Sequence, residues 1–410
     1  ITLYEDTYYS AVYSVALNCE EHAPYMFPDE YGFFRPNSPM TRGDAAQMLY
    51  SLLSVKVKGD DNFMDVSPKA EYYKATAALK ELGVVEGSRF HPDETITRRE
   101  LLGMISAFFP HLPEIFAFAD VDKTDPDYAI FCSAAAYGWI ESGSKAMVEP
   151  DAEMTRLDVA VLMNRVLGRR AENSGQHKIA GFVLDVTPQD EYYYDVAEAV
   201  LDHEYSLNGD AEVWTTNTPV EKASRGFYLV GTELYFITNN GYVLKNSSID
   251  GFCFDENGRY TSGMPELDEL VQGVLSEIID SSMEPLEMLK KAYCYTVDSF
   301  SYIKGYIYSP RDTSWANEEA YTMLTNKRGN CYCFAATFYQ LARALGFDAQ
   351  VYSGNIGSDR SPHGWVEIDI DGETYIFDPE MEMAYMENHG QKIDMFMMTY
   401  KEAAKWSYSR

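Results

Sequence analysis

Residues 328–354 read RGNCYCFAATFYQLARALGFDAQVYSG, and residues 361–380 read SPHGWVEIDIDGETYIFDPE. In the first stretch, apolar and small residues recur at helical spacing from Cys331 to Leu345, and Gly346 ends the run. Gly329 comes just before this segment and can adopt the tight turn that presents the next residues. The pattern therefore predicts a helix that begins at or near Cys331.

The start of this predicted helix suits a cysteine nucleophile. The helix macrodipole and the free amides favour thiolate over thiol, and the same amides can donate to an oxyanion. Cys333 is the rival nucleophile, but two positions further along a helix it points about 200° away, toward the predicted core. A Cys-x-Cys metal site is another interpretation, but no Cys or His cluster completes a set of four ligands, so we expect no metal.

The second stretch predicts a β-hairpin whose turn is Asp371-Gly372, a strong two-residue turn signal. With these as the central turn residues, Asp378 lies opposite Trp365, and His363 is a diagonal neighbour of Asp378 on the same face. Such neighbours are about 7–8 Å apart between backbones, within reach of side chains that lean together. A carboxylate bonded to one imidazole nitrogen would leave the other nitrogen free to take a thiol proton. The other six histidines have no comparable setting.

These motifs resemble the core of the transglutaminase-like superfamily, a papain-related α+β fold. The order is Gly-x-Cys-x-x-Phe-Ala, then a strand with His-x-Trp-Val-Glu, then Asp-Pro, and the resemblance covers roughly residues 265–410. It implies Cys331, His363 and Asp378 as the catalytic triad. The family usually has Ala between the His and the Trp, where this chain has Gly364.

No motif fixes a side-chain donor for an oxyanion. Trp315 and Tyr332 are the candidates, and either can instead serve only in packing.

An internal repeat organises the first 170 residues. Three segments align: FFRPNSPMTRGDAAQMLYSLL from Phe33, RFHPDETITRRELLGMISAFF from Arg89 and MVEPDAEMTRLDVAVLMNRVL from Met147. In each, a Pro-containing turn leads to a Thr that can cap a helix, with an acidic residue three positions later. Helix–loop–helix units of this kind pack face to face, because one unit cannot bury its apolar side alone.

A Phe-x-Asp-Val motif and a further helix precede the aligned segment in the second and third units. The first unit lacks this motif. FVLDV from Phe182, which we call the fourth motif, starts a fourth unit of the pattern but does not finish it.

The repeats resemble the S-layer homology domain over roughly residues 1–172. In that family three copies form a pseudo-threefold cluster that holds secreted proteins on the bacterial cell wall. The resemblance implies that Arg42, Arg98 and Arg156, from the Thr-Arg pairs, bind an acidic secondary cell-wall polysaccharide. A guanidinium fork suits a carboxylate bidentately. Alternatively, these arginines only cap and salt-bridge the helices.

The predicted organisation is multidomain, with all-α repeats, a small β-hairpin spacer and an α+β catalytic domain. The spacer follows from short β-rich runs split by Asn-Asn-Gly and Glu-Asn-Gly, and we expect its aromatic side chains to pack and to bind no ligand. The boundaries are 1–56, 57–112 and 113–172 for the repeats, 173–210 for a partial fourth repeat or linker, 211–263 for the spacer and 264–410 for the catalytic domain.

The composition excludes some partners. The chain has 64 acidic and 33 basic residues and a net charge of -31, which repels nucleic acid and anionic lipid. No apolar run approaches the roughly 18 residues of a membrane span. The chain begins ITLYEDTYYS, without an export signal, and we expect that such a signal has been removed.

We therefore expect a secreted cysteine enzyme on a Gram-positive cell wall, without a cofactor, acting on amide bonds of proteins or peptides through a thioester on Cys331. Water would make it a peptidase or amidase, which we favour slightly, and a lysine amine would make it a transglutaminase. The alternative is a catalytically inactive surface-binding or scaffold protein attached to cell-wall polysaccharide.

Overall fold

The computed structural model describes residues 15–113, 115–170, 182–208, 211–217, 223–280 and 282–410. The start of the chain, to which the expectation of a removed export signal refers, lies outside these ranges. The chain divides into two compact units, Ile1–Ala223 and Ser224–Arg410. Within the described ranges, no helix combines the length and the apolar character needed to cross a membrane.

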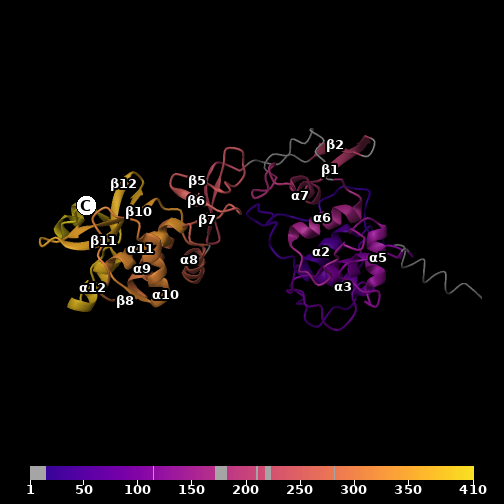
Figure 1. The fold of residues 1–410 in the computed structure, drawn as a ribbon, viewed down its shortest axis with the longest axis horizontal. Coiled ribbons are helices and arrows are strands. Elements are labelled where there is room, and N and C mark those ends of the chain that lie inside the picture. The colour runs from indigo at the N-terminus through magenta and orange to yellow at the C-terminus, as the bar shows by residue number, and fades with distance from the viewer. Residues whose placement is uncertain (1–14, 114, 171–181, 209–210, 218–222, 281) are drawn as a thin grey trace, which may run out of the picture. The chain divides into compact units, whose positions relative to one another are not determined.

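The first unit is helical and carries one antiparallel β-hairpin after its last helix (Figure 1). Its elements are α2 (Arg42–Leu52), α3 (Tyr73–Glu81), α4 (Arg98–Ser106), α5 (Tyr128–Ala136), α6 (Arg156–Leu167), α7 (Tyr193–Val200), β1 (His203–Asn208) and β2 (Ala211–Asn217). One continuous apolar core joins them.

The predicted helix caps of the three repeats are confirmed. Helices α2, α4 and α6 begin directly after Thr41, Thr97 and Thr155, whose side chains accept hydrogen bonds from the backbone amides three residues on. In α4 and α6 the side chain of the acidic residue accepts a hydrogen bond from the backbone amide of the cap threonine, which completes a capping box.

Equivalent hydrogen bonds connect the repeats in a cycle. The guanidinium of Arg42, in the first repeat, donates to the Phe90 carbonyl in the second. Arg98, in the second, donates to the Val148 carbonyl in the third. Arg156, in the third, donates to the carbonyl of Phe34, which returns the contact to the first repeat.

The fourth motif, FVLDV at 182–186, has one residue more than Phe-x-Asp-Val and completes the first repeat. In the second repeat Asp65 accepts from the Phe90 amide, and in the third Asp120 accepts from the Val148 amide. Asp185, from the fourth motif, accepts from the amide of Phe34 at 2.7 Å. The described part of the expected partial repeat, 173–210, therefore supplies the contact that the first repeat lacks.

The second unit mixes helices with small sheets, which are antiparallel except for the pair formed by β8 and β9. Its first strands are β3 (Gly226–Val230), β4 (Glu233–Ile237), β5 (Ser247–Ile249), β6 (Phe252–Phe254) and β7 (Tyr260–Thr261). Then come α8 (Pro265–Ile278), α9 (Pro285–Asp298), β8 (Ser301–Tyr302), α10 (Ala316–Asn326), β9 (Arg328–Gly329) and α11 (Cys331–Ala344). The chain continues through β10 (Ala349–Ile356), β11 (Ser361–Ile370), β12 (Glu373–Phe377), α12 (Pro379–His389), β13 (Met398–Thr399), α13 (Tyr400–Ala403) and a 3₁₀ turn, η1 (Ala404–Trp406).

Helix α11 is the centre of this unit. It contacts α9 and α10 as well as strands β10 and β11 of the sheet (Figure 1). Every residue of α11 except Tyr339 is buried. The sheet has the order β10-β11-β12-β13, with each neighbouring pair antiparallel. The second unit is thus an α+β domain with a helix buried against its sheet.

The segment expected to be one spacer, 211–263, is divided between the two units. Strand β2 pairs with β1 in the first unit, whereas β3 to β7 belong to the second. There the Arg343 guanidinium of α11 donates to the Gly251 carbonyl and lies 3.5 Å from the centre of the Phe252 ring. The turn sequences show that hairpins form, but these contacts with α11 decide to which unit they belong.

Candidate active site

The Cys331 thiol lies where the sequence places it, at the first residue of α11. The Asn330 side chain caps the helix by accepting from the amides of Tyr332 at 3.1 Å and Cys333 at 3.3 Å. Gly329 is needed before the cap, because a Cβ there would lie 2.5 Å from the Cys333 sulfur. Cys331 is 8% exposed, so the helix dipole acts on a largely desolvated thiol.

Strands β11 and β12 form the predicted hairpin in the predicted register. Asp371 and Gly372 have positive φ angles of 53° and 82°, as a two-residue hairpin turn requires. Val366 pairs with Phe377 at the far end of the ladder. Asp378 comes directly after Phe377, and His363 lies three residues before Val366 on β11. The observed register therefore agrees with the predicted pairing of these two residues.

Three hydrogen bonds hold the Asp378 carboxylate, which is fully buried. Its Oδ2 accepts from His363 Nε2 at 2.7 Å and from the Tyr408 hydroxyl at 2.6 Å. Its Oδ1 accepts from the Met381 amide at 3.1 Å. Since a carboxylate only accepts, the Nε2 proton of His363 points at Asp378 and Nδ1 is left for another partner.

Cys331 is that partner. Burial alone would lower the pKa of His363, but the charge of Asp378 and the interaction with Cys331 raise it well above its ordinary value. An imidazole in this position can take the proton of the thiol and return it. The structure thus brings all three predicted residues together.

Cys333 is held as a thiol. Its Sγ donates to the Glu319 carboxylate at 2.7 Å, and burial together with that carboxylate raises the pKa of Cys333. A thiol that donates to a carboxylate has its proton fixed and is a poor nucleophile. The structure therefore separates the roles of the two cysteines.

The two expected oxyanion donors do not have a free hydrogen-bond donor. Trp315 Nε1 donates its single hydrogen to the Asp312 carbonyl. The Tyr332 hydroxyl donates to the Tyr308 carbonyl at 3.4 Å, and the rings of Trp315 and Tyr332 pack edge to face, 5.1 Å apart. Both side chains are buried and pack, which favours the packing interpretation for both of these candidates.

Glu380 is a further buried carboxyl at the site. Its Oε2 lies 3.9 Å from His363 Nδ1, on the side of the ring that faces away from Asp378. Burial raises the pKa of Glu380 to about 7, the positive charge of His363 opposes the rise, and Asp378 and Glu387 add to it. Its charge therefore changes close to neutral pH.

The three arginines of the repeats differ in what holds them. Arg42 forms an ion pair with Glu100, and Arg98 lies 3.3 Å from Glu149. Within the described ranges, Arg156 has no carboxylate at ion-pair distance and donates to two backbone carbonyls. A surface cavity of about 490 Å³ lies over it. Its lining includes Arg156, Arg35, Asp29 and Asp44.

Two family models match the chain. Residues 49–102 match the S-layer homology domain, and residues 272–379 match the transglutaminase-like superfamily. The chain carries an S-layer homology domain followed by a transglutaminase-like core. The second match ends one residue after Asp378, so it contains all three residues of the predicted triad.

Curated relatives share part of the chain. The surface-layer 125 kDa protein of Lysinibacillus sphaericus is 29% identical over 215 residues, which cover 50% of this chain and 18% of the relative. The cellulosome-anchoring protein of Acetivibrio thermocellus is 26% identical over 210 residues, covering 47% of this chain and 45% of the relative. This chain spans less than half the length of either relative.

Among solved structures, the periplasmic domain of TgpA from Pseudomonas aeruginosa is similar at 13% identity. The matched region covers 44% of this chain and 82% of the TgpA domain. The TM-score of 0.21 is too low to establish a common fold.

The structure gives a reason for Gly364, where the family usually has alanine. A Cβ at this position would lie 2.8 Å from Cδ1 and 3.2 Å from Cα of Tyr332, the residue after the cysteine. Strand β11 therefore approaches the start of α11 more closely than a side chain at 364 would allow.

The sequence reasoning missed three features of the two domains. Tyr408 and Glu380 contact the triad, although Glu380 stands in the quoted Asp-Pro-Glu run. The third is a pair of histidines, His22 and His203, which we had expected to have no special setting. The structure brings them together with two buried glutamates.

Proposed function

We propose that the transglutaminase-like core is a cysteine enzyme that hydrolyses amide bonds of proteins or peptides. The hydrogen bond from His363 Nε2 to Asp378 carries this proposal, because it leaves Nδ1 to the thiol of Cys331. In the triad, Cys331 is the nucleophile, His363 the general base and acid, and Asp378 the group that orients the ring.

In the first half of the reaction, the Cys331 sulfur attacks the amide carbon and its proton passes to His363. The backbone amide of Cys331 is the proposed oxyanion donor, because Asn330 already takes the next two amides of α11. The C–N bond then breaks, and His363 delivers the proton to the departing amine.

The second half releases the acyl group from the thioester. His363 takes a proton from water, the resulting hydroxide attacks the thioester carbon, and the sulfur leaves as thiolate. Water needs no dedicated acceptor site, which is why we place hydrolysis before transfer to a lysine amine.

The segment beside the nucleophile offers a surface for an apolar peptide. Its large side chains are exposed, although it runs next to the start of α11: Tyr302, Ile303, Tyr306 and Ile307. The amide of Ile303 donates to the Gly329 carbonyl, and Asn330 donates to the Tyr306 carbonyl. We infer that side chains of the substrate near the scissile bond are apolar.

The S-layer homology domain is the proposed anchor on the cell wall. The cyclic contacts support an approximate threefold arrangement of the repeats, completed by the fourth motif. We infer that a secondary cell-wall polysaccharide binds in the cavity over Arg156, the one arginine of the three without an ion pair in the described part of the chain. This assigns a secreted protein to the cell surface.

Mass spectrometry of a glutamine-containing peptide mixture, incubated with the full chain and an excess primary amine, tests the reaction. Hydrolysis predicts cleaved or deamidated peptides, and Cys331→Ala must abolish them. Amine incorporation as the main product would overturn hydrolysis in favour of transfer. No Cys331-dependent product would favour the inactive surface-binding protein.

Co-sedimentation with purified cell wall tests the anchor. Arg156→Ala should reduce binding, whereas replacement of the exposed Arg89 by Ala should not. Circular dichroism confirms that both variants keep their helices. Equal binding by a folded Arg156→Ala variant would refute the assigned groove.

A further inference from the structure

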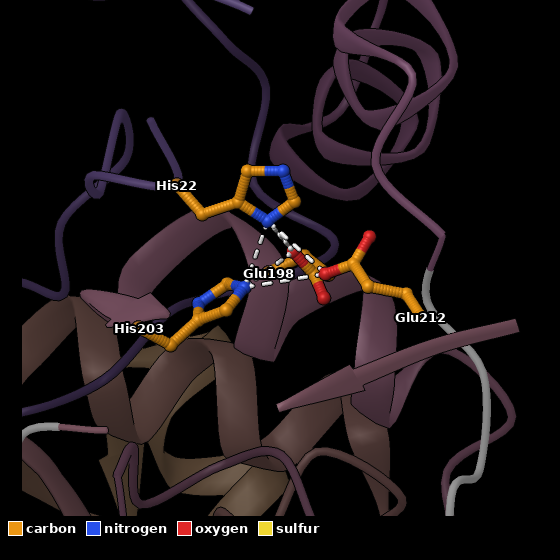
Figure 2. A group of neighbouring side chains, drawn as sticks. All are labelled: His22, Glu198, His203 and Glu212. Carbon is orange, nitrogen blue, oxygen red and sulfur yellow. Dashed lines mark hydrogen bonds and ion pairs between the residues drawn. The ribbon is translucent and has the colours of Figure 1, made fainter. Parts of the chain in front are cut away.

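The first unit contains a compact cluster of four buried side chains, His22, Glu198, His203 and Glu212 (Figure 2). Glu198 lies on α7, His203 starts β1 and Glu212 lies on β2, whereas His22 comes from the start of the described chain. The exposed fractions of the four side chains are between 0% and 2%. One donor atom of each points toward a common centre.

The four donor atoms lie within 4.8 Å of one another, and five of the six distances between them are between 2.9 and 3.5 Å. His22 Nδ1 is 2.9 Å from His203 Nε2, 3.5 Å from Glu198 Oε2 and 3.1 Å from Glu212 Oε1. His203 Nε2 is 3.3 Å from Glu198 Oε2 and 3.5 Å from Glu212 Oε1. A regular tetrahedron with edges of about 3.3 Å has its centre about 2.0 Å from each corner, which is the usual zinc–nitrogen and zinc–oxygen distance.

Without a metal, both carboxylates are paired only if both imidazoles are protonated, which gives ion pairs of 3.1–3.5 Å but brings the two facing nitrogens to 2.9 Å. One proton shared between the facing nitrogens of His22 and His203 leaves both carboxylate oxygens without a donor, and a proton on each nitrogen places two N–H groups head to head. In the described part of the chain, neither Glu198 Oε2 nor Glu212 Oε1 accepts a hydrogen bond. Two buried carboxylate oxygens without donors are costly unless a cation lies between them.

Hydrogen bonds fix the outer atoms of three of the four side chains. His203 Nδ1 donates to the Leu201 carbonyl at 3.1 Å, which leaves Nε2 with its lone pair toward the centre. Trp214 Nε1 donates to Glu198 Oε1 at 2.8 Å, and the Arg170 amide donates to Glu212 Oε2 at 3.1 Å. Partners of this kind orient the ligands of metal sites.

We propose that His22, Glu198, His203 and Glu212 bind a structural zinc ion. Two imidazole nitrogens and two carboxylate oxygens suit Zn²⁺, whereas Ca²⁺ and Mg²⁺ prefer six or more oxygen ligands. Because all four positions are filled by protein and closed to solvent, the ion has no open position for catalysis.

The site would tie together segments that are far apart in the sequence. The His22 carbonyl accepts from the His203 amide at 3.3 Å, so a backbone bridge already runs beside the cluster. Zinc adds a cross-link between the start of the first repeat and the hairpin after the fourth motif. It therefore holds closed the ring of repeats in the S-layer homology domain.

The test uses the tag-free full chain, freed of metal with a chelator and then titrated with Zn²⁺ against a competing indicator. We expect one tightly bound zinc per chain, and an increase of about 5–10 °C in the melting temperature of the first unit at 100-fold excess over Kd. Co²⁺ in place of zinc should give the visible spectrum of tetrahedral coordination. Affinity no tighter than that of a surface histidine, or an octahedral cobalt spectrum, would overturn the site.

Variants locate the ion. His203→Gln and Glu212→Gln should each weaken zinc binding at least 10-fold, whereas the exposed His91→Gln, the matched control, should bind as the wild type does. Unchanged zinc binding in both site variants would refute the assignment. If a variant fails to fold without metal, the stoichiometry and the cobalt spectrum of the wild type decide alone.

Discussion

Gly364→Ala should destabilise the second unit, because the added Cβ would lie 2.8 Å from Cδ1 and 3.2 Å from Cα of Tyr332. Tyr332 is 1% exposed and cannot swing outward. Overpacking of this kind costs about 1–3 kcal/mol. For a unit of this size, each kcal/mol lowers the melting temperature by about 2–4 °C, so we expect a decrease of about 2–12 °C.

Gly273→Ala is the matched control. Gly273 is exposed within α8, and a Cβ there meets nothing within 4 Å. Alanine in a helix interior is favoured over glycine by about 0.5–1 kcal/mol, so this variant should melt at a higher temperature. Scanning calorimetry of both variants gives opposite signs if the reasoning holds. Gly364→Ala melting at or above the wild-type temperature would refute the close approach of β11 to α11.

Three further predictions concern single contacts. Tyr408→Phe removes one donor to Asp378, worth about 1.5–3 kcal/mol, and should lower the melting temperature of the second unit. It should also slow peptide cleavage at least 10-fold at a temperature where the variant is fully folded, and an unchanged rate there would deny Tyr408 a positioning role. The pKa of Glu380 rises from 4.5 to about 7 on folding, so the second unit loses up to about 3 kcal/mol as pH increases from 4.5 through 7. Glu380→Gln should thus melt higher than the wild type at pH 8 but not at pH 4.5, and an equal difference at both would contradict this. Asp185→Asn should lower the free energy of unfolding of the first unit by about 1–3 kcal/mol, and Asp65→Asn should do the same. If only Asp65→Asn lowers it, the fourth motif does not complete the first repeat.

The parts of the site that local rules determine could be predicted from the sequence. The turn at Asp371 and Gly372 sets the register of the hairpin, and the register sets the distance from His363 to Asp378. The start of α11 at Cys331 follows from the Gly-Asn pair before it and the apolar spacing after it.

The parts that depend on distant segments could not be predicted. Tyr408 reaches Asp378 because the end of the chain pairs with Asn355, and no local pattern indicates that pairing. His22 and His203 are 181 residues apart in the sequence and meet at 2.9 Å, and no local pattern indicates that contact. We expected an unfinished fourth repeat because the motifs follow one another along the chain. In the fold, the fourth motif contacts the first repeat instead.

The rate of Cys331 alkylation as a function of pH, followed by mass spectrometry, tests the central claim most directly. The Cys331–His363 pair predicts rapid modification well below pH 8, lost in His363→Ala and kept in Cys333→Ser, where a hydroxyl can still donate to Glu319. Slow modification that rises only near pH 8.5, the ordinary pKa of a thiol, and is the same in the wild type and His363→Ala would contradict the account.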